Sequence, residues 1–303
     1  MRSRDNSTYS RNRNQSPPLA PLAPPPRGGR EWRASIITYM TIISRLATTI
    51  ALAAVATSLA AQESQHAQHT MDRERVGQLS VGYTDILDTY LSQEKFTGTE
   101  FGYLTQSLWR RDSSRMVREA VHHVLVSVAG TRGNDNSLLT LLYNLRLGWM
   151  YRWHWAAPRL TLLAGGAIDG TLGGAYDTRN NNNPAQARIA LSIDPTARLT
   201  WQLHTGRRPL ALHYDVTMPL IGMAFSPNYG QSYYEIFSRG GYDHNIVCTS
   251  PFSAPQFYQH LSVDFRLRRT TFRMGYLGEY RQMKANNLKY HQYTHSITLG
   301  WCY

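Results

Sequence analysis

The last fourteen residues constrain the fold of this 303-residue chain more than any other stretch. From Tyr290 to Tyr303, aromatic and aliphatic residues alternate with small or polar ones. Successive side chains of a strand point to opposite faces, so this period of two predicts a strand with one apolar and one polar face. The apolar face would carry Tyr293, His295, Ile297, Leu299, Trp301 and Tyr303.

This final strand is long for a soluble β-sandwich, and it closes on an aromatic residue, which is typical of outer-membrane β-barrels. Beyond the N-terminal region no apolar run approaches the roughly eighteen residues that a membrane-spanning helix needs. The mean hydropathy of −0.42 does not argue against a barrel. Barrel strands alternate, and an average over a window conceals their apolar face.

Nine further segments show the same alternation, and their spacing predicts the architecture. We expect an all-β, antiparallel up-and-down transmembrane barrel of about ten strands, with twelve as the alternative. Ser232–Phe237 and Asn245–Thr249 could add two strands, but both are short and lack alternation. The expected strands are 77–86, 97–110, 116–130, 137–153, 158–171, 185–203, 208–221, 257–268, 270–283 and 290–303.

The connections and the tryptophans give two checks of this topology. The longer connections, including 87–96, 172–184, 222–255 and 284–289, fall at one end, which we assign as extracellular. Tryptophans cluster in the opposite halves of their strands, as an aromatic girdle at one membrane interface would. The expected girdle is Trp109, Trp153, Trp155, Trp201, Trp301 and Tyr303.

The N-terminal region is expected to lie outside the fold. Residues 1–39 are proline-rich in part and are predicted to be disordered or a wrongly included upstream extension. Residues 40–61 carry a short basic start, a short apolar run and small residues, which predicts a signal peptide cleaved near Ala60 or Ala61. An anchoring helix is the alternative. Residues 62–75 form a polar segment and 76–303 the barrel, in the outer membrane of a Gram-negative bacterium.

The charge balance does not indicate nucleic-acid binding. The formal net charge is +12, but residues 1–61 hold eight of the 32 Lys/Arg and only two of the 20 Asp/Glu, so the remainder carries +6. No spacing of His, Cys, Asp or Glu predicts a metal, and no phosphate-binding glycine loop precedes a helix, so no cofactor is expected. Cys248 and Cys302 are predicted to lie at opposite ends as free thiols.

Charged residues occupy the polar parity of the strands and would line the lumen of the barrel. Ten strands leave little interior space, so a packed, ion-paired lumen is favoured over a selective channel. The expected lumen-lining residues are Arg188, Asp194, Arg198, His213, Asp215, Asp264, Arg266, Arg273 and Glu279.

Four residues at the expected extracellular rim could form a hydrolytic site. Asp85 and Asp88 facing Asp243 and His244 would be similar to the omptin proteases, in which such groups activate a water. The spacing departs from the omptin pattern, because the acids are three residues apart and Asp243 and His244 are adjacent. Turn formation by Asp243 and solvent exposure of His244 is the favoured interpretation.

Two stretches carry a family resemblance: Ser80–Ser92 (SVGYTDILDTYLS) and Pro219–Phe237 (PLIGMAFSPNYGQSYYEIF). They resemble an uncharacterised family of Bacteroidetes outer-membrane-barrel-like proteins, over roughly residues 76–303. The resemblance implies a source and a compartment and no reaction.

The sequence therefore predicts an outer-membrane barrel that serves binding or structure at the cell surface, with minor transport as a further role. Its expected partners are outer-membrane lipid, lipopolysaccharide phosphates near Lys95, Arg179, Arg239, Lys284 and Lys289, and the barrel-assembly machinery at the C-terminal strand. An omptin-like rim hydrolase and a secreted soluble β-sandwich adhesin are the alternatives.

Overall fold

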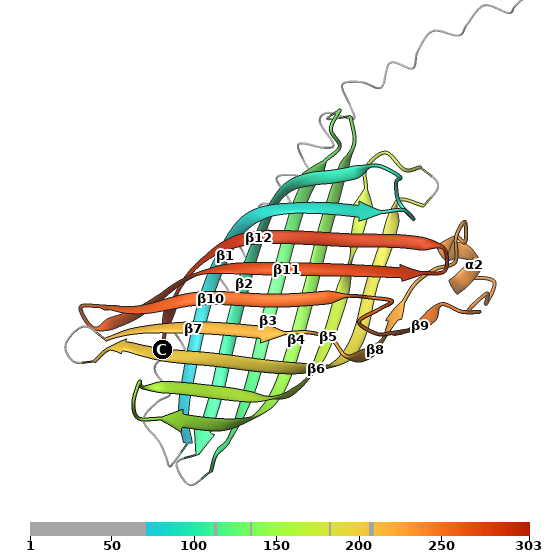
Figure 1. The fold of residues 1–303 in the computed structure, drawn as a ribbon. Helices are drawn as coiled ribbons and strands as arrows, with labels where there is room; N and C mark the ends of the chain where they lie inside the picture. Colours follow the sequence, from blue (N-terminus) through green and yellow to red (C-terminus); the bar gives the residue numbers. More distant parts are fainter. Residues whose placement is uncertain (1–70, 112–113, 134, 182, 206–208) are drawn as a thin grey trace, which may run out of the picture. The chain divides into compact units, whose positions relative to one another are not determined.

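The computed structural model describes residues 71–303 except 112–113, 134, 182 and 206–208. The expectations for residues 1–39 and 40–61, and for most of 62–75, concern residues outside this described part. Within it the chain forms one antiparallel sheet and a short helix, drawn in Figure 1. The elements are β1 (Met71–Asp88), β2 (Lys95–Arg111), β3 (Met116–Gly130), β4 (Ser137–Trp155), β5 (Leu160–Asp177), β6 (Ala185–His204), β7 (Leu210–Thr217), β8 (Ile221–Phe225), α2 (Tyr233–Phe237), β9 (Ile246–Thr249), β10 (Gln256–Leu267), β11 (Thr270–Ala285) and β12 (Leu288–Cys302).

Ten of the strands close into a barrel. Neighbours in the chain pair in turn from β1 to β7, then β7 pairs with β10, and β10, β11 and β12 follow. β12 returns to pair with β1 over thirteen residue pairs, from Val76–Cys302 to Asp88–Tyr290. β8 and β9 extend the sheet beyond β6 as two additional strands. The predicted antiparallel ten-strand barrel is confirmed, and β8 and β9 are two strands additional to the ten.

Alternation explains why these segments form the wall. In β4, Leu141, Tyr143 and Trp149 are exposed on the outer side, while the even-numbered residues from 142 to 148 point inward and are buried. β12 follows the same rule, with Ile297 and Leu299 exposed and the neighbouring Ser296 and Thr298 buried. The wall is therefore apolar outside and largely polar inside, the reverse of a soluble barrel of this size.

The secondary structure of residues 218–255, the segment of the long loop, differs from the prediction. The seventh strand was expected over 208–221, but β7 ends at Thr217 and β8 begins only at Ile221. Within Ser232–Phe237, a candidate extra strand, Tyr233–Phe237 is a helix. Ser232 caps it by accepting a hydrogen bond from Glu235 N, and the Glu235 side chain accepts one from Ser232 N. This reciprocal capping box favours a helical turn over an extended segment.

The ends of other strands also differ from the predicted bounds. β1 begins at Met71 rather than near 77, because residues 71–75 pair with Ser107–Arg111 of β2. The connection expected over 284–289 is only a two-residue turn at Asn286 and Asn287, and Lys284 pairs with Lys289 across it. Both asparagines have positive φ, 51° and 61°, as a type I′ hairpin requires. An Asn-Asn pair is suited to this turn because asparagine tolerates the left-handed region.

Replacing Asn287 by valine is expected to lower the free energy of unfolding by about 1–2 kcal/mol, because a β-branched residue is strained at positive φ. Asn287→Gly is the control and should leave stability nearly unchanged, since glycine adopts this conformation freely. Urea titration of the refolded barrel measures both. Equal stability of the two variants would contradict the assigned turn.

No helix in the described part of the chain has the length and apolarity needed to cross a bilayer.

Candidate functional site

The barrel interior is filled by ion pairs and hydrogen bonds between strands that are not neighbours in the sheet. Seven of the residues expected in the lumen are buried: Arg188, Asp194, Arg198, His213, Asp215, Arg273 and Glu279. Asp264 is half-buried. Arg266 has the same parity, but it is exposed because it lies one residue before the end of β10, where the β10–β11 hairpin passes the rim.

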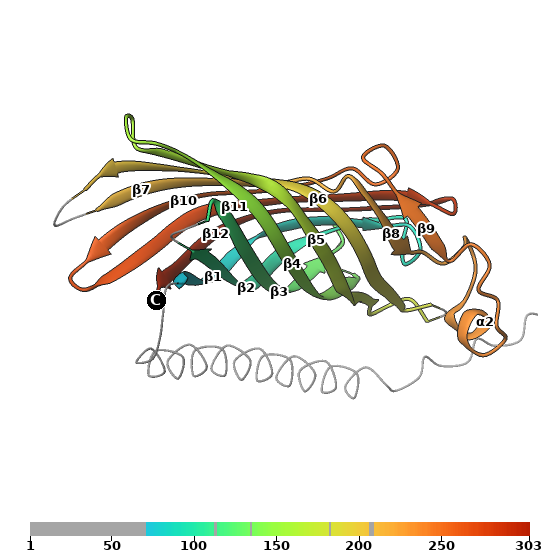
Figure 2. The ribbon, with the colours of Figure 1, turned by 90° about the horizontal axis from the view of Figure 1, so that it is seen from below.

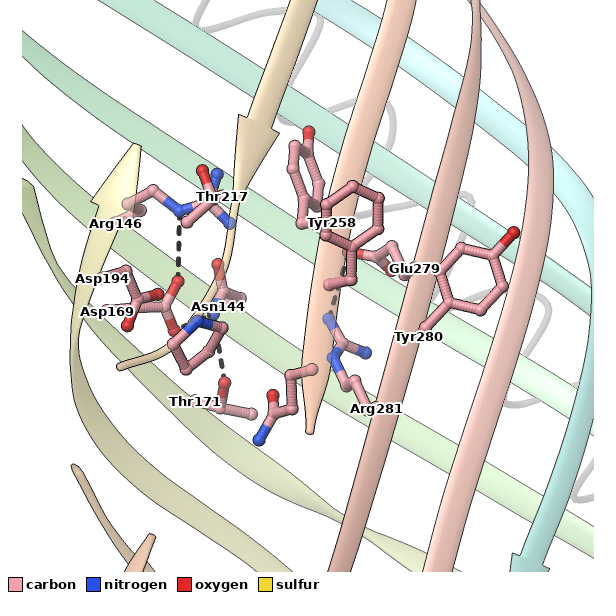
Figure 3. Close-up of a pocket in the computed structure, with 13 residues that line it drawn as sticks. Asn144, Arg146, Asp169, Thr171, Asp194, Thr217, Tyr258, Glu279, Tyr280 and Arg281 are labelled. Atoms are coloured by element: carbon pink, nitrogen blue, oxygen red, sulfur yellow. Dashed lines mark hydrogen bonds and ion pairs between the residues drawn. The ribbon is translucent and has the colours of Figure 1, made fainter. Parts of the chain in front are cut away.

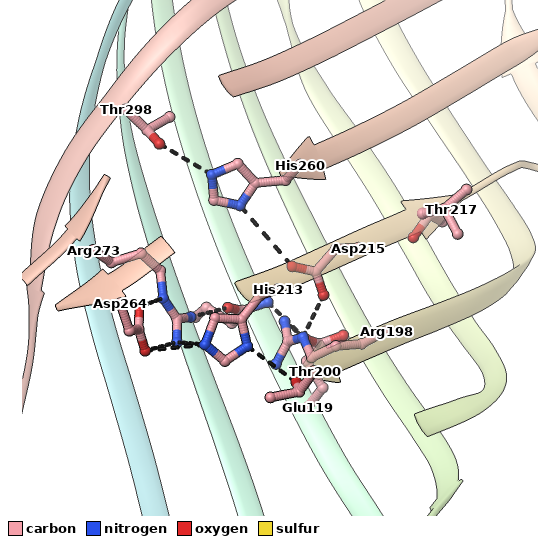
Figure 4. A network of polar contacts seen from close by, with 12 residues as sticks. Glu119, Arg198, Thr200, His213, Asp215, Thr217, His260, Asp264, Arg273 and Thr298 are labelled. Atoms are coloured by element: carbon pink, nitrogen blue, oxygen red, sulfur yellow. Dashed lines mark hydrogen bonds and ion pairs between the residues drawn. The ribbon is translucent and has the colours of Figure 1, made fainter. Parts of the chain in front are cut away.

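Arg273 of β11 is the centre of the first network, shown in Figure 4. Its guanidinium donates to both oxygens of Asp264, at 2.5 Å and 2.7 Å. It also donates to Glu74 of β1 at 3.1 Å and to Gln106 of β2 at 3.3 Å. Because Arg273 is only 1% exposed, these contacts replace the water that its charge would otherwise need.

A second buried arginine extends this network across the lumen. Arg198 of β6 pairs with Asp215 of β7 and donates to Glu119 of β3 at 3.0 Å. Gln106 also donates to Glu119, at 2.9 Å, which joins the two arginine centres. The Arg198–Glu119 pair therefore places charged side chains across part of the interior, between β6 and β3.

Two histidines in this region form relays that resemble catalytic arrangements. His213 is hydrogen-bonded to Thr200 at 3.0 Å through Nδ1 and to Asp264 at 3.1 Å through Nε2. His260 contacts Thr298 at 3.0 Å, with Asp215 4.0 Å away. In the first relay Arg273 already holds Asp264, and neither threonine lines any of the three cavities described below. The contacts therefore fit a packed core better than a nucleophile.

A further cluster lies around Glu279 of β11. Arg281 donates to Glu279 at 3.1 Å, and His123 of β3 lies 3.3 Å from the same oxygen. On the β2 side, Glu100 accepts a hydrogen bond from Gln292 of β12 at 2.9 Å. Several of these interior partners are not among the residues that the sequence predicts for the lumen. Their inward parity was the available signal, and they are Glu74, Glu100, Gln106, Glu119, His123, Arg146, Asp169 and Arg281.

Cavities remain beside these clusters. The first, of about 30 Å³, contains the Arg146–Asp169 ion pair and is lined as well by Asp194, Tyr258 and Arg281 (Figure 3). A second, of about 50 Å³, adjoins it. A cavity needs about 10–15 Å³ for each water, so each has room for only a few. A third, of about 560 Å³, lies where β2 and β4 end and β3 and β5 begin, and Arg110, Arg115 and Arg152 line it.

The four residues of the proposed rim chemistry are not brought together. Asp88 is buried, pairs with Arg188 and accepts from Tyr90 N at 3.1 Å. Asp85 contacts His291 at 3.1 Å and Lys95 at 3.7 Å. Asp243 and His244 form an exposed pair of their own, 2.9 Å apart, with side chains 88% and 78% exposed. Among the described residues, no contact joins either acid to that pair.

The residues of the expected girdle lie near one rim. Trp109, Trp153, Trp155, Trp201 and Trp301 all stand close to the C-terminal ends of their strands. These strands run in the same direction, so their ends meet at one side. Tyr303 joins the rim through backbone hydrogen bonds with Arg75. Cys302 is also at this rim, whereas Cys248 lies in β9, and both are free thiols.

The sequence of this chain matches a known protein family. The model of a family described as protein of unknown function (DUF3316) covers residues 43–302. The chain belongs to this family. The DUF3316 match extends across the whole barrel and includes residues before β1. A search of curated proteins found no match.

Solved structures similar to this DUF3316 chain are barrels of outer membranes. The outer membrane protease OmpT from Escherichia coli aligns with a TM-score of 0.40 at 9% identity, covering 79% of this chain and 99% of that one. The translocator domain of the autotransporter NalP from Neisseria meningitidis gives 0.33 at 10% identity, covering 85% and 97%. At these levels of similarity neither protein assigns an activity to this chain.

Proposed function

We propose that this chain is an outer-membrane β-barrel that is closed to bulk solutes and acts by binding, or as a structural element, at the cell surface. The signal peptide and the Bacteroidetes source inferred from the sequence belong to the same proposal. The observation that carries it is the reversed polarity of the barrel. Exposed aliphatic and aromatic side chains cover the outer wall, while ion pairs fill the interior. Burying such an apolar wall requires lipid or a partner of equal area.

The packed interior argues against transport as the main role. Arg198 of β6 reaches Glu119 of β3, three strands away around the ring, and Arg273 of β11 reaches Glu74 of β1 on the inner side of β12. The cavities between the interior clusters, at about 30 and 50 Å³, have room for a few waters but not for larger solutes. Only minor passage of water or small ions is expected through such an interior.

The loop-bearing end supports surface binding. α2 is held over the barrel by Tyr233, whose hydroxyl accepts from Ala187 N at 2.7 Å and donates to Gln186 at 2.9 Å. Burial raises the pKa of Tyr233, which keeps this hydroxyl protonated. Tyr90 packs edge-on against the same ring. Around this anchored helix several aromatic side chains remain exposed, and exposed aromatic groups are typical of binding surfaces: Tyr229, Tyr234, Phe237, Tyr242 and Phe252.

Two partners expected from the sequence remain part of this proposal. Lys95, Arg179, Arg239, Lys284 and Lys289 are exposed in the part of the chain that the structure describes, where lipopolysaccharide phosphates would meet them. Arg179 already pairs with Asp135 at 2.6 Å, and Lys95 with Asp85, so the others are the stronger candidates. The barrel-assembly machinery would act on β12, which closes the ring.

The proposal is tested by comparing boiled and unboiled protein on a detergent gel, using native membranes and the full chain. A closed barrel resists detergent until heated, so a shift in mobility on boiling is expected. Liposomes containing the protein should swell in sugar solutions no faster than empty liposomes. Identical mobility would favour a soluble sandwich, and rapid swelling would instead show an open pore.

A further inference from the structure

The wall of the barrel divides on one side. β7 pairs with β10 up to Thr217–Tyr258, and there the pairing stops. Beyond that point β8 continues along β6, and its other edge pairs with β9 instead of β10. Gln256 and Phe257 at the start of β10 pair only with β11. The ten-strand ring closes through β7 and β10, but beyond Thr217–Tyr258 no backbone pairing in the described chain joins β8 to β10, which leaves an opening in the half of the wall nearer the long loops (Figure 1).

Pro219 accounts for this opening. Met218 and Leu220 donate their backbone N–H groups to Pro195 and Ile193 of β6. Because successive residues of a strand direct their N–H groups to opposite sides, residue 219 would direct its N–H toward β10. Proline has no N–H, so the bond that would continue the β7–β10 ladder is missing. The opening is thus encoded in the sequence.

A cavity of about 50 Å³ adjoins this opening. By the parity of their strands, Arg188, Arg281, Met283 and Tyr290 line it from the inside, and Ile189 and Phe225 line it from the outer wall. No Asp or Glu of the described chain lines it. The neighbouring cavity of Figure 3 shares Arg281 with it and reaches Phe257 and Tyr280 of the outer wall. Polar interior and apolar exterior therefore meet at one place in the wall.

One arginine at this cavity has a hydrogen-bond donor without a partner. Arg281 donates to Glu279 through one nitrogen, but its buried Nη1 has no hydrogen-bond partner in the described structure. Arg188 pairs with Asp88 and lies over the ring of Tyr290, 3.4 Å from its centroid. An unpaired guanidinium donor in a buried site is costly, and an anionic oxygen would satisfy it.

The outer side of the opening suits an acyl chain. Ile221 and Met223 of β8 are exposed, and they pair with Ile193 and Leu191 on the apolar face of β6. Ile246 of β9, opposite Phe225, extends this face. The apolar wall is therefore continuous from the barrel onto the β8–β9 extension. A chain lying against it would have its polar end at the cavity.

We propose that the opening between β8 and β10 binds an acyl-chain amphiphile with an anionic head group, which enters sideways from the membrane. The carboxylate or phosphate contacts Arg281 beside Arg188, and the acyl chain lies along β8 and the start of β10. The proposal rests on the membrane location proposed above, and it names a ligand class that surface binding alone does not specify.

The test uses full-length protein in phosphatidylcholine vesicles with a fatty acid that carries a diazirine beside its carboxylate. After illumination, peptide mass spectrometry should find adducts on the inward segments around Leu142 and Met283. The matching fatty alcohol should label only outward segments such as the one around Ile168. Arg281→Gln should reduce the inward adducts about tenfold, as expected when one charge-assisted hydrogen bond is lost. A phosphatidic acid probe in a parallel arm tells whether a phospholipid supplies the head group.

Two further variants keep the test decisive. Met283→Trp fills the cavity without changing charge and should also remove the inward adducts, while Arg266→Gln at the opposite rim should not. Heat-modifiability confirms the fold of each variant. Equal inward labelling by the acid and the alcohol, or labelling unaffected by both Arg281→Gln and Met283→Trp, would overturn the site. Absence of labelling anywhere on the wall would instead contradict the membrane location.

Discussion

Replacement of Arg273 by alanine is expected to lower the free energy of unfolding by about 3–5 kcal/mol, the largest effect we anticipate for a single substitution. The guanidinium of Arg273 holds Asp264 through two hydrogen bonds and also contacts Glu74 and Gln106. Removing it leaves two carboxylates in a partly buried network without their cation. An unpaired charge of that kind costs more than the ion pair itself contributes.

Urea unfolding of the refolded barrel, followed by tryptophan fluorescence, measures this loss. Arg266→Ala is the matched control, because Arg266 is exposed in the adjacent strand and its loss should change stability by no more than about 0.5 kcal/mol. The loss of unfolding free energy in Arg273→Lys should lie between these two values, since lysine keeps the charge but not the planar guanidinium that donates two hydrogen bonds to Asp264. Similar stabilities for Arg273→Ala and Arg266→Ala would mean that the network does not hold the barrel together.

Replacement of Ile168 by arginine is expected to destabilise the barrel in lipid by about 2–4 kcal/mol, as for a charge near the middle of a bilayer. Ile168 lies near the middle of β5 and is 45% exposed on the outer wall. It pairs with Leu147 of β4 and Ile193 of β6, which are also exposed. In a soluble protein the same substitution at an exposed position would be nearly neutral.

The measurement is reversible unfolding in phosphatidylcholine vesicles. Leu267→Arg is the control: Leu267 is the last residue of β10 and is 61% exposed at the rim, where an arginine should cost at most about 1 kcal/mol. A large difference between Ile168→Arg and Leu267→Arg supports a membrane-embedded wall. Equal, small effects would show that water, not lipid, surrounds Ile168.

Most of the fold follows from local pattern. Alternation over β4 and β12 identifies both strands and the faces they expose, because the side-chain period of a strand is two regardless of its neighbours. β3 begins and ends where the pattern predicts, at Met116 and Gly130. The predicted strand boundaries are wrong where pairing with a distant strand sets them. Residues 71–75 become strand only because β2 extends far enough to pair with them.

The sequence predicts which residues line the interior but not how they pair. Inward parity places Arg198, Asp215 and Glu119 in the lumen, but parity does not say which strands face one another across it. The Arg198–Glu119 pair joins residues 79 positions apart, and the Arg273–Glu74 pair joins residues 199 apart. Likewise, the sequence offered Asp88 as a rim acid, while the structure turns it inward to Arg188.

The sequence by itself determined the strand pattern and the apolar outer face. The Asn286–Asn287 turn and, through Pro219, the point at which β7 parts from β10 also follow from local chemistry, although alternation alone predicts a longer connection over 284–289 and a strand that continues to residue 221. Each of these depends on backbone geometry or on the polarity of consecutive residues, which are local properties. Only the tertiary structure decided which charges pair, that β9 takes the edge of β8, and that Arg281 keeps a free donor beside an opening in the wall. Those features depend on the register and closure of the ring, which join residues far apart in the chain.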